Sequence, residues 1–246
     1  MKPNPHSAPP LLYSLRRSER AKNTRIIVKP GKIEVVAPLK VSERRIKAFV
    51  EAQQDWIRAA VKRIADKVQA VPDLAPAQYA DGATVTFQGR QIPVQIKPTT
   101  TKTVRIQLHG DTAFIVYLPI SVDQQQSSEL IRQGMTRWMK QQARQHATTL
   151  IEKHAPRSGL FPRSLRIKTQ KSRWGSCGPH NDINLNWLLM LAPPAALEYV
   201  VIHELCHIKH KNHSKDFWQL VAEHLPDYQQ QRRWLKQHGA SLMRGL

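Results

Sequence analysis

The hydrophobic pattern at the start of the chain predicts a hairpin followed by a helix. Two short runs of apolar and β-branched residues, 24–28 and 32–36, flank a Lys-Pro-Gly turn signal, which is typical of a β-hairpin. From Ser42, a suitable N-cap, apolar residues recur at helical spacing as far as Val68. The pattern predicts one long helix whose buried stripe includes Trp56.

Short alternating runs follow a connector that contains two prolines. They predict four strands, at residues 83–88, 91–96, 103–108 and 112–118, with glycine at two of the turns. We therefore expect a flexible tail at 1–18 and a small β-rich module with one long helix at 19–120.

The second half changes to helical periodicity and then to a strand, loop and strand. A helix is predicted from Ser127 to Lys153, and alternation near 165–170 and from Ile183 predicts two strands. The Pro193-Pro194 pair suits the start of another helix. Residues 121–246 thus form a second domain, and the fold class is α+β.

The helix after the two prolines carries the motif His-Glu-x-x-His. His203 and His207 are four residues apart, so both imidazoles project from one helical face and can bind one zinc ion. Glu204 lies beside them, near the open coordination position. The alternative is a set of polar surface histidines, but the apolar residues on both sides favour the metal site.

A catalytic zinc ion needs a third protein ligand, for which the sequence offers three candidates. His210 shares the face of the pair, but it lies roughly 10 Å along the helix axis from His203, which makes it a neighbour of the site. His213 follows the expected helix end, where Asn212 can reverse the chain in the left-handed conformation. Glu223 on a following helix is the alternative, and His213 is preferred.

Three neutral histidines on Zn²⁺ would make the bound water acidic enough to ionise near neutral pH. Glu204 would then take its proton while hydroxide attacks a polarised carbonyl group. Amide hydrolysis is the natural outcome of this arrangement. The motif indicates the type of reaction more firmly than the substrate.

Composition adds a strongly basic character. The 246 residues carry 38 Lys and Arg against 18 Asp and Glu, a formal net charge of +20, which favours salt-sensitive contact with nucleic acid. A solvated basic surface is the alternative, because the cations are scattered. Two cysteines and no apolar run of membrane-spanning length favour a cytoplasmic protein that contacts no membrane.

Several segments together resemble a known family. They are KSRWGSC at 171–177, INLNWLL at 183–189, YVVIHELCHIKHKNHSKDFW at 199–218 and PDYQQQRRWLKQHG at 226–239. The set is similar to the YgjP-like zinc metallopeptidase family, which is related to the WLM and SprT-like zincin peptidases. The resemblance implies a zincin-like catalytic domain in which His203, His207 and His213 bind Zn²⁺ and Glu204 is the catalytic acid and base.

The SRWGSC segment lies between two predicted strands beside the zinc helix. Arg173 or Ser176 could donate to a peptide carbonyl or to an oxyanion in the substrate cleft. Trp174 and Cys177 are better explained as core residues, with Gly175 forming the turn.

We consider two functions. The first is a zinc-dependent metallopeptidase that acts on protein or peptide substrates. The second is a basic nucleic-acid-associated protein with a structural or inactive zinc site, and a protease acting on nucleoprotein would combine them. Glu204 favours the enzyme, because a structural site has no use for a base.

Overall fold

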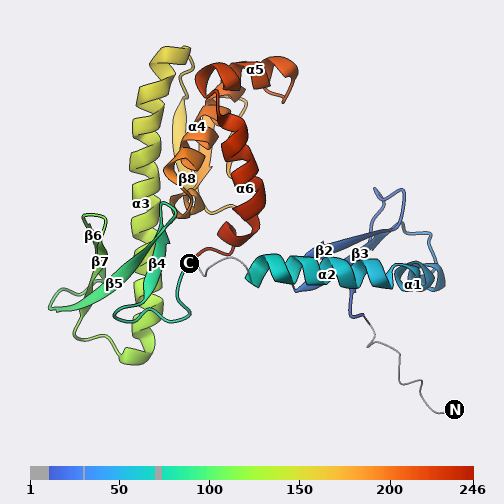
Figure 1. Cartoon of the computed structure of the whole chain (residues 1–246), viewed down its shortest axis with the longest axis horizontal. Helices are drawn as coiled ribbons and strands as arrows, with labels where there is room; N and C mark the ends of the chain where they lie inside the picture. The colour runs from blue at the N-terminus through green and yellow to red at the C-terminus, as the bar shows by residue number, and fades with distance from the viewer. Residues whose placement is uncertain (1–10, 30, 70–73) are drawn as a thin grey trace. The chain divides into compact units, whose positions relative to one another are not determined.

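The structure is a computed structural model that describes residues 11–29, 31–69 and 74–246. Contacts between Cα atoms divide the chain into two compact units, Met1–Pro72 and Asp73–Leu246. Most of the predicted tail, at 1–10, lies outside the described residues. Figure 1 colours the chain from blue at the N-terminus to red at the C-terminus.

The first unit contains a three-stranded sheet in the order β1-β3-β2. The predicted hairpin is confirmed, because β2 (Arg25–Lys29) pairs antiparallel with β3 (Lys32–Ala37). Part of the expected tail is instead β1 (Ser14–Arg17), which pairs parallel with β3. Polar residues can form this strand because the ladder satisfies their backbone, and the Arg16 side chain pairs with Glu34 at 2.9 Å.

The predicted long helix is two helices, α1 (Glu43–Ala52) and α2 (Gln54–Gln69). The expected N-cap is confirmed, with the Ser42 hydroxyl 3.5 Å from the backbone nitrogen of Arg45. The helix breaks at Gln53, whose φ of −108° and ψ of 11° are not helical. Apolar spacing continues across the break, so the sequence pattern did not reveal it.

Within the described part of the first unit, the buried core cluster comprises Val35, Ala37, Ile46, Val50 and Ile57. The expected burial of Trp56 is wrong, since this residue is 49% exposed. The buried face of α2 runs through Ile57 and Ala60, and Trp56 lies outside it.

A four-stranded sheet opens the second unit, and it confirms all four predicted strands there. They are β4 (Thr84–Phe87), β5 (Arg90–Thr99), β6 (Arg105–His109) and β7 (Ala113–Pro119), in the order β4-β5-β7-β6. The central β5 and β7 are parallel, and the other neighbours are antiparallel.

The sheet shares its core with the long helix α3 (Gln124–Ser158). Rings of Phe87 and Phe114 each lie 5.1 Å from the ring of Trp138 on α3. Because this packing joins sheet and helix, the boundary between the units lies at 72/73 and differs from the one predicted at 120/121. The helix also extends beyond the predicted Lys153, through Pro156, and ends at Gly159 with φ of 68°.

A second small sheet and three helices complete this unit. The strands β8 (Ser164–Lys168), β9 (Gly175–Cys177) and β10 (Asp182–Asn186) lie in the order β8-β10-β9, with β8 and β10 parallel. They are followed by a 3-10 turn, η1 (Trp187–Leu191), and by α4 (Pro194–Lys209), α5 (Lys215–His224) and α6 (Tyr228–Leu242).

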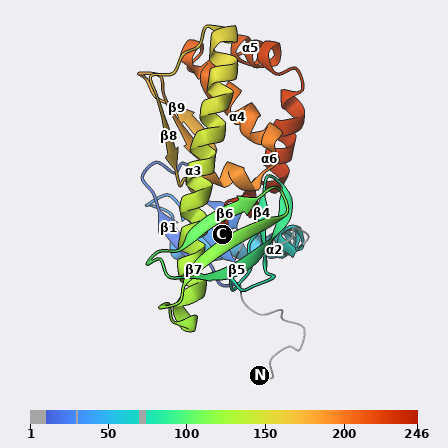
Figure 2. The same ribbon diagram turned by 90° about the vertical axis from the view of Figure 1, so that its left-hand side faces the viewer.

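Helix α4 is central and contacts α3, α6, α5 and β9 (Figure 2). Pro194 occupies its first turn, as the double proline predicted. The chain is therefore an α+β protein, in agreement with the predicted class. None of the described helices is both long and apolar enough to cross a membrane.

Candidate metal centre

Helix α4 and the turn that follows it bring three imidazoles together. The ligand nitrogens of His203, His207 and His213 lie within 4.8 Å of one another. Those of His203 and His213, both Nε2, are 3.1 Å apart. Two nitrogen ligands of a tetrahedral zinc ion lie about 3.4 Å apart, so the donor set and its spacing fit zinc.

The end of α4 determines where His213 lies. The helix stops at His210, which is extended with φ of −118° and ψ of 104°. Asn212 was expected to reverse the chain in the left-handed conformation, but among the described non-glycine residues only Gln88 and Asn181 have positive φ. The reversal therefore begins at His210.

The start of α5 holds this turn in place. The Ser214 hydroxyl accepts a hydrogen bond from the backbone N–H of Phe217, at 3.3 Å. Phe217 is fully buried, and its ring stacks on His207 with centroids 4.4 Å apart. The first turn of α5 thus packs directly beneath the imidazoles.

Main-chain contact orients His207. Its Nδ1 lies 2.9 Å from the carbonyl oxygen of His210, which can only accept, so Nδ1 carries the proton. Nε2 is then free to bind a metal ion, an arrangement common among metal-binding histidines. His210 thus contributes its backbone to the site, while its side chain stays outside the imidazole group.

Glu223, the alternative third ligand, is not brought to this group. Its carboxylate accepts a hydrogen bond from Gln219 on the same helix, at 3.3 Å. Among the described residues, the cluster of metal-binding groups comprises the three histidines alone. The geometry favours His213.

Burial keeps the imidazoles in the form that binds metal. It lowers the pKa of His203 to about 3, with further contributions from the neighbouring His207 and His213. The pKa of His207 is also lowered, again mainly by burial. Both rings are therefore neutral near pH 7, as a metal ligand must be.

The side chain of Glu204 on α4 is almost fully buried. Its residue is 4% exposed, and burial raises the pKa of the carboxyl to about 8, against the nearby charge of Arg173 and a hydrogen bond with the Cys177 backbone. Oxygen Oε2 is buried without a hydrogen-bond partner in the described part of the chain. Such a carboxylate is suited to exchange a proton near neutral pH.

Gly175 leaves the space that this carboxylate occupies. A Cβ atom at position 175 would lie 2.6 Å from Oε1 of Glu204 and 2.8 Å from its Cγ. The glycine was expected to form a turn, but it belongs to β9, with its strand against β10. Its function here is close approach, because only glycine lets the strand lie so near the carboxylate.

Two cavities meet at Glu204. One, of about 370 Å³, lies between α4, β9 and α6, and the other, of about 300 Å³, extends past the imidazoles towards Lys211. His203, Glu204, Gly175 and Arg173 line both. A substrate can therefore extend on either side of the base.

The loop residues expected in the cleft do line it. Arg173 borders both cavities, and Ser176 borders the second, where its hydroxyl accepts a hydrogen bond from Asn184 at 3.2 Å. Trp174 and Cys177 pack against the core, as predicted, but each also lines one of the cavities. Cys177 is not part of the metal-binding cluster.

Comparison with known families agrees with this geometry. Residues 22–238 match the family described as YgjP-like, metallopeptidase domain. The chain belongs to the YgjP-like family. The match covers both structural units, so the resemblance carried by the sequence motifs is confirmed.

Similarity to individual proteins is more limited for this YgjP-like chain. It is 44% identical over 84 residues to the UTP pyrophosphatase of Escherichia coli K12, which covers 32% of this chain and 50% of that protein. The matched region thus spans half the length of that relative. A solved structure, the metallopeptidase zymogen of Pyrococcus abyssi abylysin, shares 23% identity with a TM-score of 0.34, over 37% of this chain and 92% of that chain.

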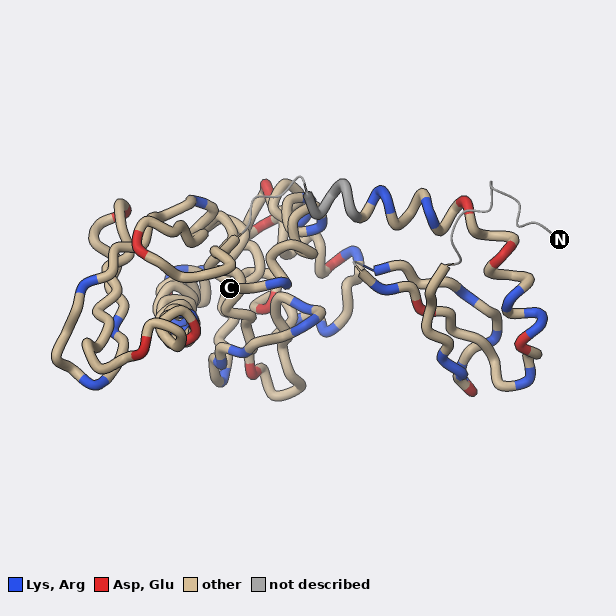
Figure 3. The backbone as a smooth tube through the Cα atoms, turned by 90° about the horizontal axis from the view of Figure 1, so that it is seen from below, with Lys and Arg blue, Asp and Glu red and all other residues tan. Residues whose placement is uncertain are grey.

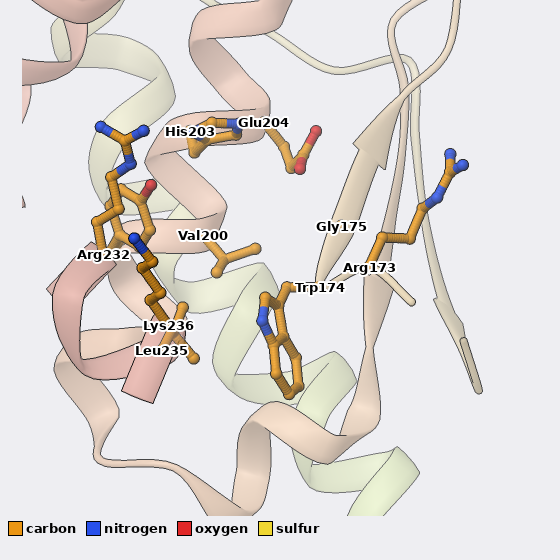
Figure 4. A pocket seen from close by; sticks show the side chains of 10 residues that line it. Arg173, Trp174, Gly175, Val200, His203, Glu204, Arg232, Leu235 and Lys236 are labelled. Carbon is orange, nitrogen blue, oxygen red and sulfur yellow. The ribbon is translucent and has the colours of Figure 1, made fainter. Parts of the chain in front are cut away.

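Three polar residues of the larger cavity were not expected from the sequence of this YgjP-like chain. They are Tyr199 on α4 and Arg232 and Lys236 on α6, which line the larger cavity. Figure 4 shows the two cations. Arg232 and Lys236 are four apart, so helical spacing places them on one face. Which way that face points depends on how α6 packs, and the sequence pattern carries no such information.

Proposed function

We propose that this protein is a zinc-dependent metallopeptidase that hydrolyses peptide bonds with Glu204 as the general base. The observation that supports it best is the meeting of three imidazoles with a buried carboxylate at one cavity. Membership of a metallopeptidase family agrees with it.

His203, His207 and His213 would hold the ion. Bound there, zinc would supply Lewis acidity and would make a water molecule acidic enough to ionise near neutral pH. Glu204 accepts the proton of the attacking water and returns it to the leaving amine. Arg173 and Ser176, at the cavity wall, donate hydrogen bonds to the carbonyl oxygen that becomes negative.

The base can be tested with Glu204→Gln, which keeps the shape of the side chain and removes its ability to accept a proton. We expect at least about 100-fold slower cleavage of an unfolded protein substrate, because general base catalysis contributes on that scale. Zinc content, measured in parallel, should stay the same. Equal cleavage by both proteins would contradict the proposal.

The ligand set is tested by metal analysis of His213→Ala. Loss of a direct ligand should lower zinc stoichiometry after dialysis against a weak chelator. His210→Ala is the matched control, because its carbonyl group still orients His207. Glu223→Ala should also retain zinc, and loss in that variant with retention in His213→Ala would reverse the assignment.

A second candidate is hydrolysis of a phosphoanhydride bond in a nucleoside triphosphate. The relative from Escherichia coli is named a UTP pyrophosphatase, and the matched region covers half of it. Lys and Arg side chains, which suit phosphate, line both cavities. Two assays separate the substrate classes: release of pyrophosphate or phosphate from UTP, and release of peptides from a protein substrate. Glu204→Gln is the control in both assays.

We also assign the protein to the cytoplasm. Cys177 and Cys206 are free thiols, which supports a reducing compartment.

A further inference from the structure

The larger cavity has an apolar floor and a cationic rim. Trp174, Val200 and Leu235 form the floor, and Arg232 and Lys236 project from α6 at one side (Figure 4). His203 and Glu204 border the same cavity on α4. The cations therefore stand beside the reacting groups and not on a remote surface.

Charge in this cavity is unbalanced. Among the described residues that line it, Glu204 is the one acidic residue, and Arg173 is a third cation in the wall. Within the described part of the chain, neither Arg232 nor Lys236 forms an ion pair, whereas Arg163 and Lys153 elsewhere do. Cations gathered in a cleft attract anionic ligands more strongly than scattered surface cations.

Arg232 is also held in place by an aromatic ring. Its guanidinium carbon lies 4.3 Å from the ring centroid of Trp218, which itself stacks on Tyr228. Stacking restricts the arginine while leaving the edge of the guanidinium free to donate hydrogen bonds. A restrained guanidinium loses less entropy when it binds an anion.

We propose that Arg232 and Lys236 form a subsite that binds the phosphate groups of the substrate beside Glu204. The planar guanidinium fits two phosphate oxygens at once, and Lys236, one helical turn away, adds a second charge. This proposal rests on the hydrolase site proposed above, and it assigns to that site a substrate that carries phosphate groups. A phosphorylated substrate would place its anionic part over α6 and its scissile bond at the imidazoles.

The test is calorimetric binding of inorganic pyrophosphate to the zinc-loaded protein. Arg232→Gln should weaken binding by about tenfold or more, because a charged hydrogen-bond donor is lost. Arg233→Gln is the matched control, since Arg233 is exposed on the same helix but does not line the cavity. Its affinity should stay within about twofold of wild type.

Lys236→Gln provides a second variant in case Arg232→Gln folds poorly. It should also weaken the binding of pyrophosphate. Succinate, a dianion without phosphorus, should bind far more weakly than pyrophosphate. The proposal is overturned if Arg232→Gln and Lys236→Gln bind pyrophosphate with wild-type affinity. It is also overturned if Arg233→Gln loses as much pyrophosphate affinity as those two variants, or if succinate binds the wild-type protein as tightly as pyrophosphate does.

Failure of the subsite can be told apart from failure of the proposed function. Pyrophosphate binding does not require turnover, whereas the effect of Glu204→Gln does. If Arg232→Gln keeps its affinity for pyrophosphate while Glu204→Gln is inactive, the proposed subsite is contradicted and the proposed hydrolase activity is supported.

Discussion

The carboxylate of Glu204 fills the volume that a side chain at position 175 would need. This contact joins a strand residue to a helix residue far away in the sequence. Position 175 is therefore as restrictive as a catalytic position, although glycine has no reactive group.

Gly175→Ala should displace the Glu204 carboxylate, because the new methyl carbon would lie 2.6 Å from Oε1. We expect a loss of about 100-fold in kcat, the scale of a 1 Å misplacement, with zinc content unchanged. Gly178→Ala is the control, since its Cβ would meet its nearest atom at 3.6 Å. Wild-type activity in Gly175→Ala would contradict this account.

Residue spacing within the motif predicted which of its side chains meet. It did not predict which residues of other helices and strands pack around them. The motif spacing indicated His203, His207 and Glu204, the expected end of the helix indicated His213 as the third ligand, and the structure brings the three imidazoles together. Gly175 and Arg232 were not predicted, because their place depends on how β9 and α6 pack against α4.

The first turn of α5 connects local folding to the metal centre. Ser214 caps this helix directly after His213, so loss of the cap should destabilise the first turn of α5 and the position of the His213 imidazole. Ser214→Ala should lower the free energy of unfolding by about 1 kcal/mol and weaken zinc retention. Chemical denaturation and metal analysis measure the two effects, with the exposed Ser121→Ala as control. If the variant is less stable but retains all its zinc, the Ser214 cap does not hold the metal-binding residues in place.

The pairing of β8 with β10 predicts an acid-sensitive contribution to stability. Hydrogen bonds from Arg163 and Ser164 lower the pKa of Asp182 from 3.8 to about 2. Because the folded pKa is lowered, the stabilisation is present above the unfolded pKa and is lost as the pH falls through the folded one.

We therefore expect the stability difference between wild type and Asp182→Asn to shrink as the pH falls from about 5 to about 2. Urea midpoints across this range measure it. Asp227→Asn, an exposed carboxylate without a capping hydrogen bond, is the control. A difference that is constant with pH would mean that Asp182 acts through packing alone.

Elements with a regular pattern bounded by turn residues were mostly predicted well, whereas a three-residue strand and a break inside a regular helical pattern were not. The hairpin, the four strands of the larger sheet and α4 agree with the sequence pattern. The three-residue β9 is too short to show alternation, and the break at Gln53 leaves the apolar spacing of α1 and α2 intact.

At the scale of the whole molecule, the domain boundary was the least predictable feature. A change from strands to a helix near residue 120 resembles a boundary in sequence. The packing of Phe87 and Phe114 on Trp138 joins both sides into one core. Such contacts between distant segments are not visible in local periodicity.

The net charge of +20 gives a prediction for the intact chain. Lys and Arg are distributed along both units (Figure 3). We expect duplex DNA or RNA to bind with an affinity that falls steeply between about 50 and 200 mM salt, because phosphate contacts release counterions. Fluorescence anisotropy measures it, and affinity that ignores salt would argue against nucleic-acid contact.

Residues 169–174 connect β8 to β9 and carry Arg173 and Trp174 to the cavity wall. The Asn186 side chain donates to the carbonyl oxygen of Gln170 at 2.8 Å, which anchors the base of this connection. His203, Glu204 and His207 lie on a different element, α4. Exchanges in this loop that keep Arg173 can therefore alter which molecules are recognised while Glu204 and the imidazoles stay in place, which makes this loop the natural place for relatives to diverge in specificity.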